Sequence, residues 1–141
     1  MSMRRVGPDE AKELMDKEGY AYVDVRSIPE FQAGHPAGAY NVPLLHLGPA
    51  GMTPNADFVG VMEKNFPKDA KLVVGCKAGG RSAQAVALLA RAGYTQLVDQ
   101  RCGFEAAQDA SGQVEPGWRP RGLPVSSDAP ADHTYEHLRS R

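Results

Sequence analysis

Apolar and polar positions form two kinds of block, which alternate through the first hundred residues. Short apolar runs predict buried strands at residues 20–25, 39–43, 71–75 and 95–99. Longer stretches with apolar residues on one face predict helices at 8–17, 55–66 and 80–93, with a short helical turn at 27–34. Short strands that alternate with helices are typical of an open α/β sheet with mostly parallel strands.

The two clearest signals adjoin each other. The run KLVVG at 71–75 is the strongest strand pattern, and the Ala- and Leu-rich helix from residue 80 follows it after a short loop, with Gly93 as its expected C-cap. This order places the loop at the carboxyl end of the sheet, where open α/β sheets bind their ligands. Residues 44–54, LLHLGPAGMTP, contain enough Gly and Pro to predict another loop.

The C-terminal part of the chain has a different character. Residues 109–124 are rich in Gly and Pro, and Trp118 is the side chain expected to anchor them to the body of the protein. Residues 126–141 are polar, which predicts a mobile tail. We therefore expect a single domain over residues 1–125 and a flexible tail over residues 126–141.

Composition and charge narrow the functional classes. A chain of 141 residues with 42% hydrophobic and 23% charged residues is typical of one soluble globular domain. The net charge of −1 gives no overall attraction to nucleic acid or to a membrane, so any anion recognition must be local. No apolar window suits a membrane span or a signal peptide, and two cysteines are too few for a disulfide framework. We expect a cytoplasmic protein with a free thiol at Cys76.

The segment VVGCKAGGRSA, residues 73–83, admits two interpretations. A tight Gly-containing loop before a helix directs backbone N–H groups and the positive helix end at one point, which favours an anion. Gly75 and Gly80, followed by Arg81 and Ser82, approach the P-loop pattern of nucleotide-binding proteins. Arg81 stands where that pattern requires Lys, and no run of four apolar residues ending in Asp accompanies it. The P-loop interpretation is therefore disfavoured.

The second interpretation makes Cys76 a nucleophile. It is the first residue after the strand, and a helix N-terminus with nearby cations, here Lys77 and Arg81, favours the reactive thiolate. Gly79 and Gly80 permit a sharp turn. The alternative is an inert buried cysteine at the end of a strand, a common place for a free thiol.

Two motifs in this chain resemble those of the rhodanese-like sulfurtransferases. CKAGGRS (76–82) is similar to their active-site loop, and DVRSIPEFQAGHPAGAYNVP (24–43) is similar to their other signature. CGFEAA and GLPV match the family's closing segments in part, so that the resemblance covers about residues 4–125. Within the family, the resemblance is strongest to single-domain thiosulfate sulfurtransferases of bacterial and plant type.

The resemblance implies both a fold and a reaction. The fold is an open, mostly parallel five-stranded sheet with helices on both faces. Cys76 would take the outer sulfur of thiosulfate as a persulfide and pass it to cyanide or a thiol, without a cofactor or metal. Backbone N–H groups of the loop would stabilise the persulfide. The substrate-binding residues would be Lys77, Ala78, Gly79, Gly80 and Arg81.

Two other functions remain open. Cysteine-dependent phosphatases of the same general fold have five residues between Cys and Arg, whereas four separate Cys76 from Arg81 here, which favours a bare sulfur atom over a phosphate. A rhodanese-like module that carries a persulfide to or from a protein partner would use the same cysteine. Turnover with small molecules distinguishes the enzyme from the carrier.

Polar residues of the first signature have structural explanations as well as catalytic ones. Asp24, at a strand end, suits an ion pair or a turn hydrogen bond. Arg26 and Glu30 are four apart and are expected to pair with each other. His35 is expected to form a hydrogen bond within its own loop.

Three features depart from the family pattern. Cys102 stands where the family usually has Gly. It is interpreted either as a small residue that fills this position or as a relay thiol near Cys76. An insertion at about residues 108–121 contains Trp118, which would replace the family's tryptophan, and we expect the inserted segment to shape the mouth of the site. His133 and His137 would form a possible metal pair if the tail were helical, and are otherwise solvated side chains.

Overall fold

The computed structural model describes residues 4–108 and 110–141. Five strands form one sheet in which every pairing is parallel. Their order across the sheet is β1 (Arg4–Val6), β8 (Gln96–Gln100), β7 (Lys71–Gly75), β2 (Ala21–Asp24) and β4 (Tyr40–Asn41). This arrangement confirms the expected five-stranded parallel sheet.

Strand β7 shows why the sheet has helices on both faces. Leu72 and Val74 pack into one hydrophobic core, while Val73 packs into another. All three side chains are fully buried, because successive residues of a strand point to opposite faces. A strand buried on both sides is a continuous apolar run, which is the pattern that the sequence displays at 71–75.

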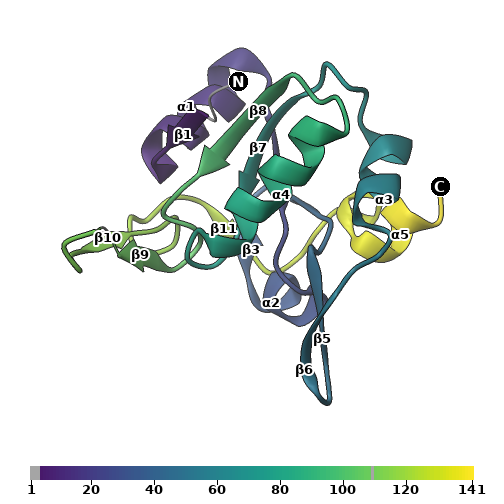
Figure 1. Ribbon diagram of the computed structural model, residues 1–141. Coiled ribbons are helices and arrows are strands. Elements are labelled where there is room, and N and C mark those ends of the chain that lie inside the picture. Colours follow the sequence, from purple (N-terminus) through teal and green to yellow (C-terminus); the bar gives the residue numbers. More distant parts are fainter. Residues whose placement is uncertain (1–3, 109) are drawn as a thin grey trace.

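Helices cover the two faces unequally (Figure 1). The first core lies under three helices, α3 (Phe58–Asn65), α4 (Gly80–Arg91) and α5 (Tyr135–Arg139). The second core lies under α1 (Pro8–Glu18), together with Phe31 of α2 (Ile28–Ala33) and Trp118. Helices on both faces, as expected, complete the α/β architecture.

The C-terminal segment differs from the expected mobile tail. A 3₁₀ helix at Ala131–His133 leads into α5, which lies beside α3 in Figure 1. Tyr135 and Leu138 are buried in the first core, and Asn55 Nδ2 donates a hydrogen bond to the Tyr135 hydroxyl at 3.0 Å. Asn65 Nδ2 donates to the Leu138 carbonyl at 2.9 Å. Two buried apolar residues three apart on one helical face, together with these hydrogen bonds, hold this short segment on the domain.

Several short strands of the structure were not predicted by the hydrophobic pattern. The segment 44–54, predicted as a loop, contains the hairpin β5 (Leu45–Gly48) and β6 (Gly51–Pro54). A second hairpin, β9 (Ala106–Gln108) with β10 (Val114–Pro116), lies in the C-terminal region, and β3 (His35–Pro36) pairs with β11 (Val125–Ser126). Both hairpins project from the end of the sheet that carries α2 (Figure 1).

None of the described helices is both long enough and apolar enough to span a membrane.

Candidate active site

The cysteine loop lies between the end of β7 and the start of α4. Cys76 is the first residue beyond the strand, and only 2% of it is exposed. Its Sγ accepts a hydrogen bond from the Gly79 amide at 3.0 Å. Gly79 has a left-handed backbone with φ of 97°, which turns its N–H toward the sulfur. The loop therefore binds its own sulfur atom through a backbone donor at a helix N-terminus.

The loop after β8 holds the cysteine loop in place. The Phe104 amide donates to the Cys76 carbonyl at 2.7 Å, and the Glu105 amide donates to the Lys77 carbonyl at 3.1 Å. The approach is so close that a Cβ on Gly103 would lie 2.3 Å from the Lys77 carbonyl oxygen. Glycine at 103 is thus required by packing against the cysteine loop.

Ser82 and Asp99 form a support that sequence reasoning missed. Ser82 Oγ lies 2.6 Å from Asp99 Oδ1 and 3.1 Å from the Gly79 carbonyl oxygen, so that it ties the first turn of α4 to β8. Arg5 Nε donates to Asp99 Oδ2 at 3.0 Å. A buried Asp near the end of strand QLVDQ was the one available signal, since a buried carboxylate requires partners.

Arg81 is engaged by α2. Its Nη1 and Nη2 donate to the two carboxylate oxygens of Glu30 at 2.7 and 3.1 Å, and Ser27 Oγ donates to the same carboxylate at 2.8 Å. Burial would raise the pKa of Glu30, but the hydrogen bonds from Arg81 and Ser27 lower it to about 2. Much of the charge of Arg81 is therefore compensated within the protein.

The expected Arg26–Glu30 pair is wrong, because Arg26 pairs with Asp24. Arg26 Nη2 lies 2.7 Å from Asp24 Oδ2 and also donates to the Gly34 carbonyl at 2.6 Å. Both side chains are buried, and Arg26 Cζ lies 4.3 Å from the centroid of the Phe104 ring. Asp24 therefore has the structural ion pair that was expected of it.

Lys77 is the cation of the loop that remains available to an anion. It is exposed, and within residues 4–108 and 110–141 no carboxylate lies within ion-pair distance of it. It opens onto a cleft of about 340 Å³, which we call the Lys77 cleft. Its walls include Arg26, Glu30, Lys77, Phe104, Glu105 and Arg119. Ala78 and Gly80 are also exposed, whereas Gly79 is buried against Arg101.

Cys102 is directed toward the second hairpin. It is fully buried, and its Sγ lies 3.6 Å from Glu115 Oε2 of β10. Burial and the neighbouring Glu115 carboxylate raise the pKa of this thiol. A protonated thiol that is hydrogen-bonded to a carboxylate fits a buried filler of a glycine position better than a relay nucleophile.

Three further side chains have structural partners. Trp118 is fully buried, donates from Nε1 to the Pro124 carbonyl at 2.7 Å and anchors its segment as expected. His35 Nδ1 lies 2.8 Å from the Phe31 carbonyl oxygen, as expected for a local hydrogen bond. His133 stacks on Tyr40 with 3.7 Å between ring centroids. Across the described part of the chain, no three His, Cys, Asp or Glu side chains gather as metal ligands would.

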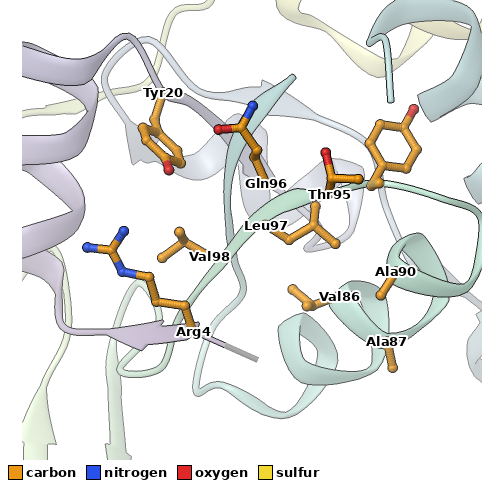
Figure 2. Close-up of a pocket in the computed structure, with 10 residues that line it drawn as sticks. Arg4, Tyr20, Val86, Ala87, Ala90, Thr95, Gln96, Leu97 and Val98 are labelled. Atoms are coloured by element: carbon orange, nitrogen blue, oxygen red, sulfur yellow. The ribbon is translucent and has the colours of Figure 1, made fainter. Parts of the chain in front are cut away.

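A separate cavity of about 520 Å³ lies between α4 and β8. Figure 2 shows Val86, Ala87 and Ala90 of α4 on one side of it, with Leu97 and Val98 of β8 on the other. None of the residues that line it belongs to the loop 76–81 or to the Lys77 cleft. It is a mainly apolar cavity with no cysteine in its lining, and it is not part of the cysteine site.

A parallel α/β sheet whose central strand is followed by a cysteine, with a backbone amide at a helix N-terminus bonded to its sulfur, is suited to chemistry at a thiol. The chain matches the rhodanese-like domain over residues 7–110, and it belongs to that family.

Relatives of similar sequence are found in plants and bacteria. The chain is 37% identical over 109 residues to thiosulfate sulfurtransferase 16, chloroplastic, of Arabidopsis thaliana, which covers 77% of this chain and 82% of the relative. It is 34% identical over 118 residues to thiosulfate sulfurtransferase GlpE of Pseudomonas putida, covering 79% and 96%. The crystal structure of Rv0390 from M. tuberculosis superimposes with a TM-score of 0.74 at 28% identity, covering 91% of this chain and all of that one.

Proposed function

We propose that this protein is a thiosulfate sulfurtransferase that carries sulfur as a persulfide on Cys76. The observation that carries the proposal is the hydrogen bond from the Gly79 amide to Cys76 Sγ at the N-terminus of α4. A backbone donor at a positive helix end stabilises negative charge on sulfur, which both the thiolate and the persulfide require. The names of two relatives, both thiosulfate sulfurtransferases, support the choice of donor.

The reaction has two steps in which atoms and charge balance. The Cys76 thiolate attacks the outer sulfur of thiosulfate, the S–S bond of the donor breaks, and sulfite leaves with the electron pair. The resulting Cys76 persulfide is then attacked at its terminal sulfur by the acceptor, either cyanide or a thiolate. Thiocyanate or a new persulfide leaves, and the Cys76 thiolate is restored.

Each residue of the loop has a distinct part in this mechanism. Backbone N–H groups of residues 77–81 stabilise the negative charge that develops on the terminal sulfur. Lys77, which has no ion-pair partner within residues 4–108 and 110–141, attracts the thiosulfate dianion, while Arg81 contributes mainly to the shape of the loop because Glu30 holds it. Ala78 and Gly80 leave the approach to the sulfur free of bulky side chains.

The mass of the intact protein after incubation with thiosulfate tests the proposal. We expect a gain of one sulfur atom in the wild type and none in Cys76→Ser, together with thiocyanate formation from thiosulfate and cyanide in the wild type alone. The absence of any gain in mass would refute persulfide chemistry. A stable persulfide with negligible thiocyanate formation would instead identify a carrier that depends on a protein partner, and Cys76-dependent hydrolysis of an aryl phosphate would identify a phosphatase.

A further inference from the structure

A smaller cavity, of about 220 Å³, lies between α2 and residues 127–136 of the C-terminal segment, and we call it the His35 cavity. None of the residues that line it belongs to the loop 76–81 or to the Lys77 cleft. Its base consists of buried side chains, and they are Phe31, His35, Asn41 and Tyr135. The packing of the C-terminal segment on the domain therefore creates a site that is separate from the cysteine.

His35 places a hydrogen-bond acceptor in this cavity. Its Nδ1 lies 2.8 Å from the Phe31 carbonyl oxygen, and because a carbonyl can only accept, Nδ1 carries the proton of the neutral imidazole. The ring also stacks on the Phe31 ring, with 3.8 Å between centroids, which fixes its orientation. Nε2 has a lone pair and no partner within residues 4–108 and 110–141. Since only 1% of His35 is exposed, Nε2 is a buried acceptor without a donor.

Asn41 supplies a second acceptor to the same cavity. Its Nδ2 donates to the carbonyl oxygens of Asp24 and Arg26, each at 3.0 Å, so both amide hydrogens are used. These carbonyls also settle which atom of the amide is oxygen, because an oxygen in that place would face two other acceptors. Oδ1 is left with no donor from the described part of the chain, although only 1% of Asn41 is exposed.

Buried acceptors need a donor, because removing an oxygen or nitrogen lone pair from water without a new hydrogen bond is costly. A single water molecule accounts for about 30 Å³ of liquid volume, so a cavity of about 220 Å³ has room for more than one. The cavity can therefore hold a small molecule that brings its own donors to His35 and Asn41.

The remaining lining residues favour a cation. Glu136 of α5 is exposed at the rim, and none of the described residues that line the cavity is Lys or Arg. Thr134 Oγ1 donates its hydrogen to the Ala131 carbonyl at 3.0 Å and so offers the cavity no donor. Ile28 and Ala129 add apolar surface, against which a short hydrocarbon stem can lie.

We propose that the His35 cavity binds a small organic ammonium ion with a short apolar stem. The N–H groups of the ammonium donate to His35 Nε2 and Asn41 Oδ1, and the carboxylate of Glu136 offsets its charge. An ammonium group has three donors and no acceptor, and therefore it complements a site built from acceptors. The inference goes beyond the proposed function, because the cavity and the loop 76–81 have no residue in common.

Three probes of equal chain length and different charge test this inference: n-butylammonium, 1-butanol and butyrate. Each is titrated into the protein at neutral pH and constant ionic strength, and backbone amide signals are followed by ¹H–¹⁵N NMR. We expect n-butylammonium to shift the amides of segments 31–35, 40–42 and 134–136 saturably, with a Kd on the order of 1 mM. 1-Butanol binds at least about fivefold more weakly, and butyrate causes no saturable shift.

Two variants locate the charge that the ammonium recognises. Glu136→Gln removes the rim carboxylate alone, so it should raise the Kd of n-butylammonium about three- to fivefold and leave that of 1-butanol within a factor of about two. Asp132→Asn is the matched control, because Asp132 is an exposed carboxylate of the same segment that does not line the cavity. It removes the same charge and should change the Kd of n-butylammonium by less than about twofold.

His35→Phe tests the buried acceptor. The substitution keeps an aromatic ring that can stack on Phe31 but lacks Nε2, and so it should abolish the preference for n-butylammonium over 1-butanol. If this variant does not fold, the comparison of Glu136→Gln with Asp132→Asn decides the matter. Cys76→Ser should bind n-butylammonium as tightly as the wild type, which separates this result from the outcome of the sulfur-transfer experiment.

Other outcomes overturn the inference. Equal Kd values for n-butylammonium and 1-butanol, or tighter binding of butyrate, would mean that the cavity does not select a cation. Equal weakening by Glu136→Gln and Asp132→Asn would assign the effect to the overall charge of the protein and not to the cavity. Saturable shifts that omit the three segments named above would place the binding site elsewhere on the molecule.

Discussion

Gly79 has a left-handed backbone, and a Cβ at this position would lie 2.5 Å from the Arg101 carbonyl oxygen. A side chain here would strain the backbone and displace the amide that donates to Cys76 Sγ. Gly79→Ala should therefore lower the free energy of unfolding by about 1–3 kcal/mol and abolish most of the sulfur gain on Cys76. Urea denaturation and the mass of the thiosulfate-treated protein measure the two effects.

Gly80→Ala is the matched control for stability. A Cβ on Gly80 meets nothing within 4 Å, and Gly80 is the first residue of α4. Alanine at a helical position is favoured over glycine by about 0.5–1 kcal/mol, so this variant should be at least as stable as the wild type. A Gly79→Ala protein as stable as Gly80→Ala and fully loaded with sulfur would contradict the role given to the Gly79 backbone.

Glu30 gives the fold a specific sensitivity to acid. Its pKa is lowered from 4.5 to about 2 in the folded protein, so its contribution to stability is fully present above its unfolded pKa. That contribution is lost as the pH falls from about 5 toward about 2. Glu30→Gln should be less stable than the wild type at neutral pH, and the difference should shrink over this range, as followed by urea denaturation at each pH.

Glu13→Gln removes the same charge from an exposed pair with Lys17 on α1. Because exposed pairs of this kind contribute about 0.3–0.5 kcal/mol, this variant should follow the wild-type acid profile closely. Equal acid profiles for Glu30→Gln and Glu13→Gln would mean that the Glu30–Arg81 pair has no special part in stability.

At the scale of elements, α5 is a short helix whose stability depends on its packing. Five residues are too few for an isolated helix, so Leu138, buried against α3, must supply much of what holds it in place. Leu138→Ala should lower the free energy of unfolding by about 2 kcal/mol. This value is at the lower end of the range for Leu-to-Ala substitutions in a core, because a segment at the end of a chain can move to fill part of the cavity. Chemical denaturation provides the measurement.

His137→Ala is the control on the same helix, since His137 is exposed. It should change stability by no more than about 0.5 kcal/mol. If Leu138→Ala were as mild as His137→Ala, then α5 would contribute no more to stability than the mobile tail expected from its polar sequence.

The elements that the sequence predicts well are those with an apolar pattern of their own. Strand β7 begins and ends where KLVVG does, and α1, α2 and α4 match their predicted ranges to within two residues at each end. The hairpins could not be predicted, because Leu47, Met52 and Val114 are exposed and no burial pattern marks their strands. The three-residue strand β1 is likewise too short to form a pattern.

For the site, the cysteine loop was predictable and its partners were not. A Gly-rich turn between a strand and a helix has a local signature, and the positions of Cys76 and Gly79 agree with it. The pair between Glu30 and Arg81 joins residues 51 apart, and the hydrogen bonds from Phe104 and Glu105 to the cysteine loop depend on tertiary contacts alone. Sequence spacing favoured Arg26 for Glu30, but burial of Asp24 beside Arg26 provided the stronger partner.

At the scale of the whole molecule, the two hydrophobic cores share the strands of one sheet. Strand β7 contributes Leu72 and Val74 to the first core and Val73 to the second, so that loss of either core would disturb a strand that the other core also uses. Trp118, the single tryptophan of the chain, lies in the second core and contacts Tyr22 edge-on, with 5.4 Å between ring centroids. Its fluorescence therefore reports on the face opposite α3, α4 and α5.

This sharing predicts one cooperative unfolding transition. The denaturation midpoint from Trp118 fluorescence should coincide with that from far-ultraviolet circular dichroism, to which the helices of the first core contribute strongly. Leu138→Ala, which alters only the first core, should shift both midpoints equally, although Trp118 lies on the other side of the sheet. If the fluorescence midpoint stayed at its wild-type value while the dichroism midpoint fell, α5 and its core would unfold separately from the sheet, and the protein would contain two stability units rather than one.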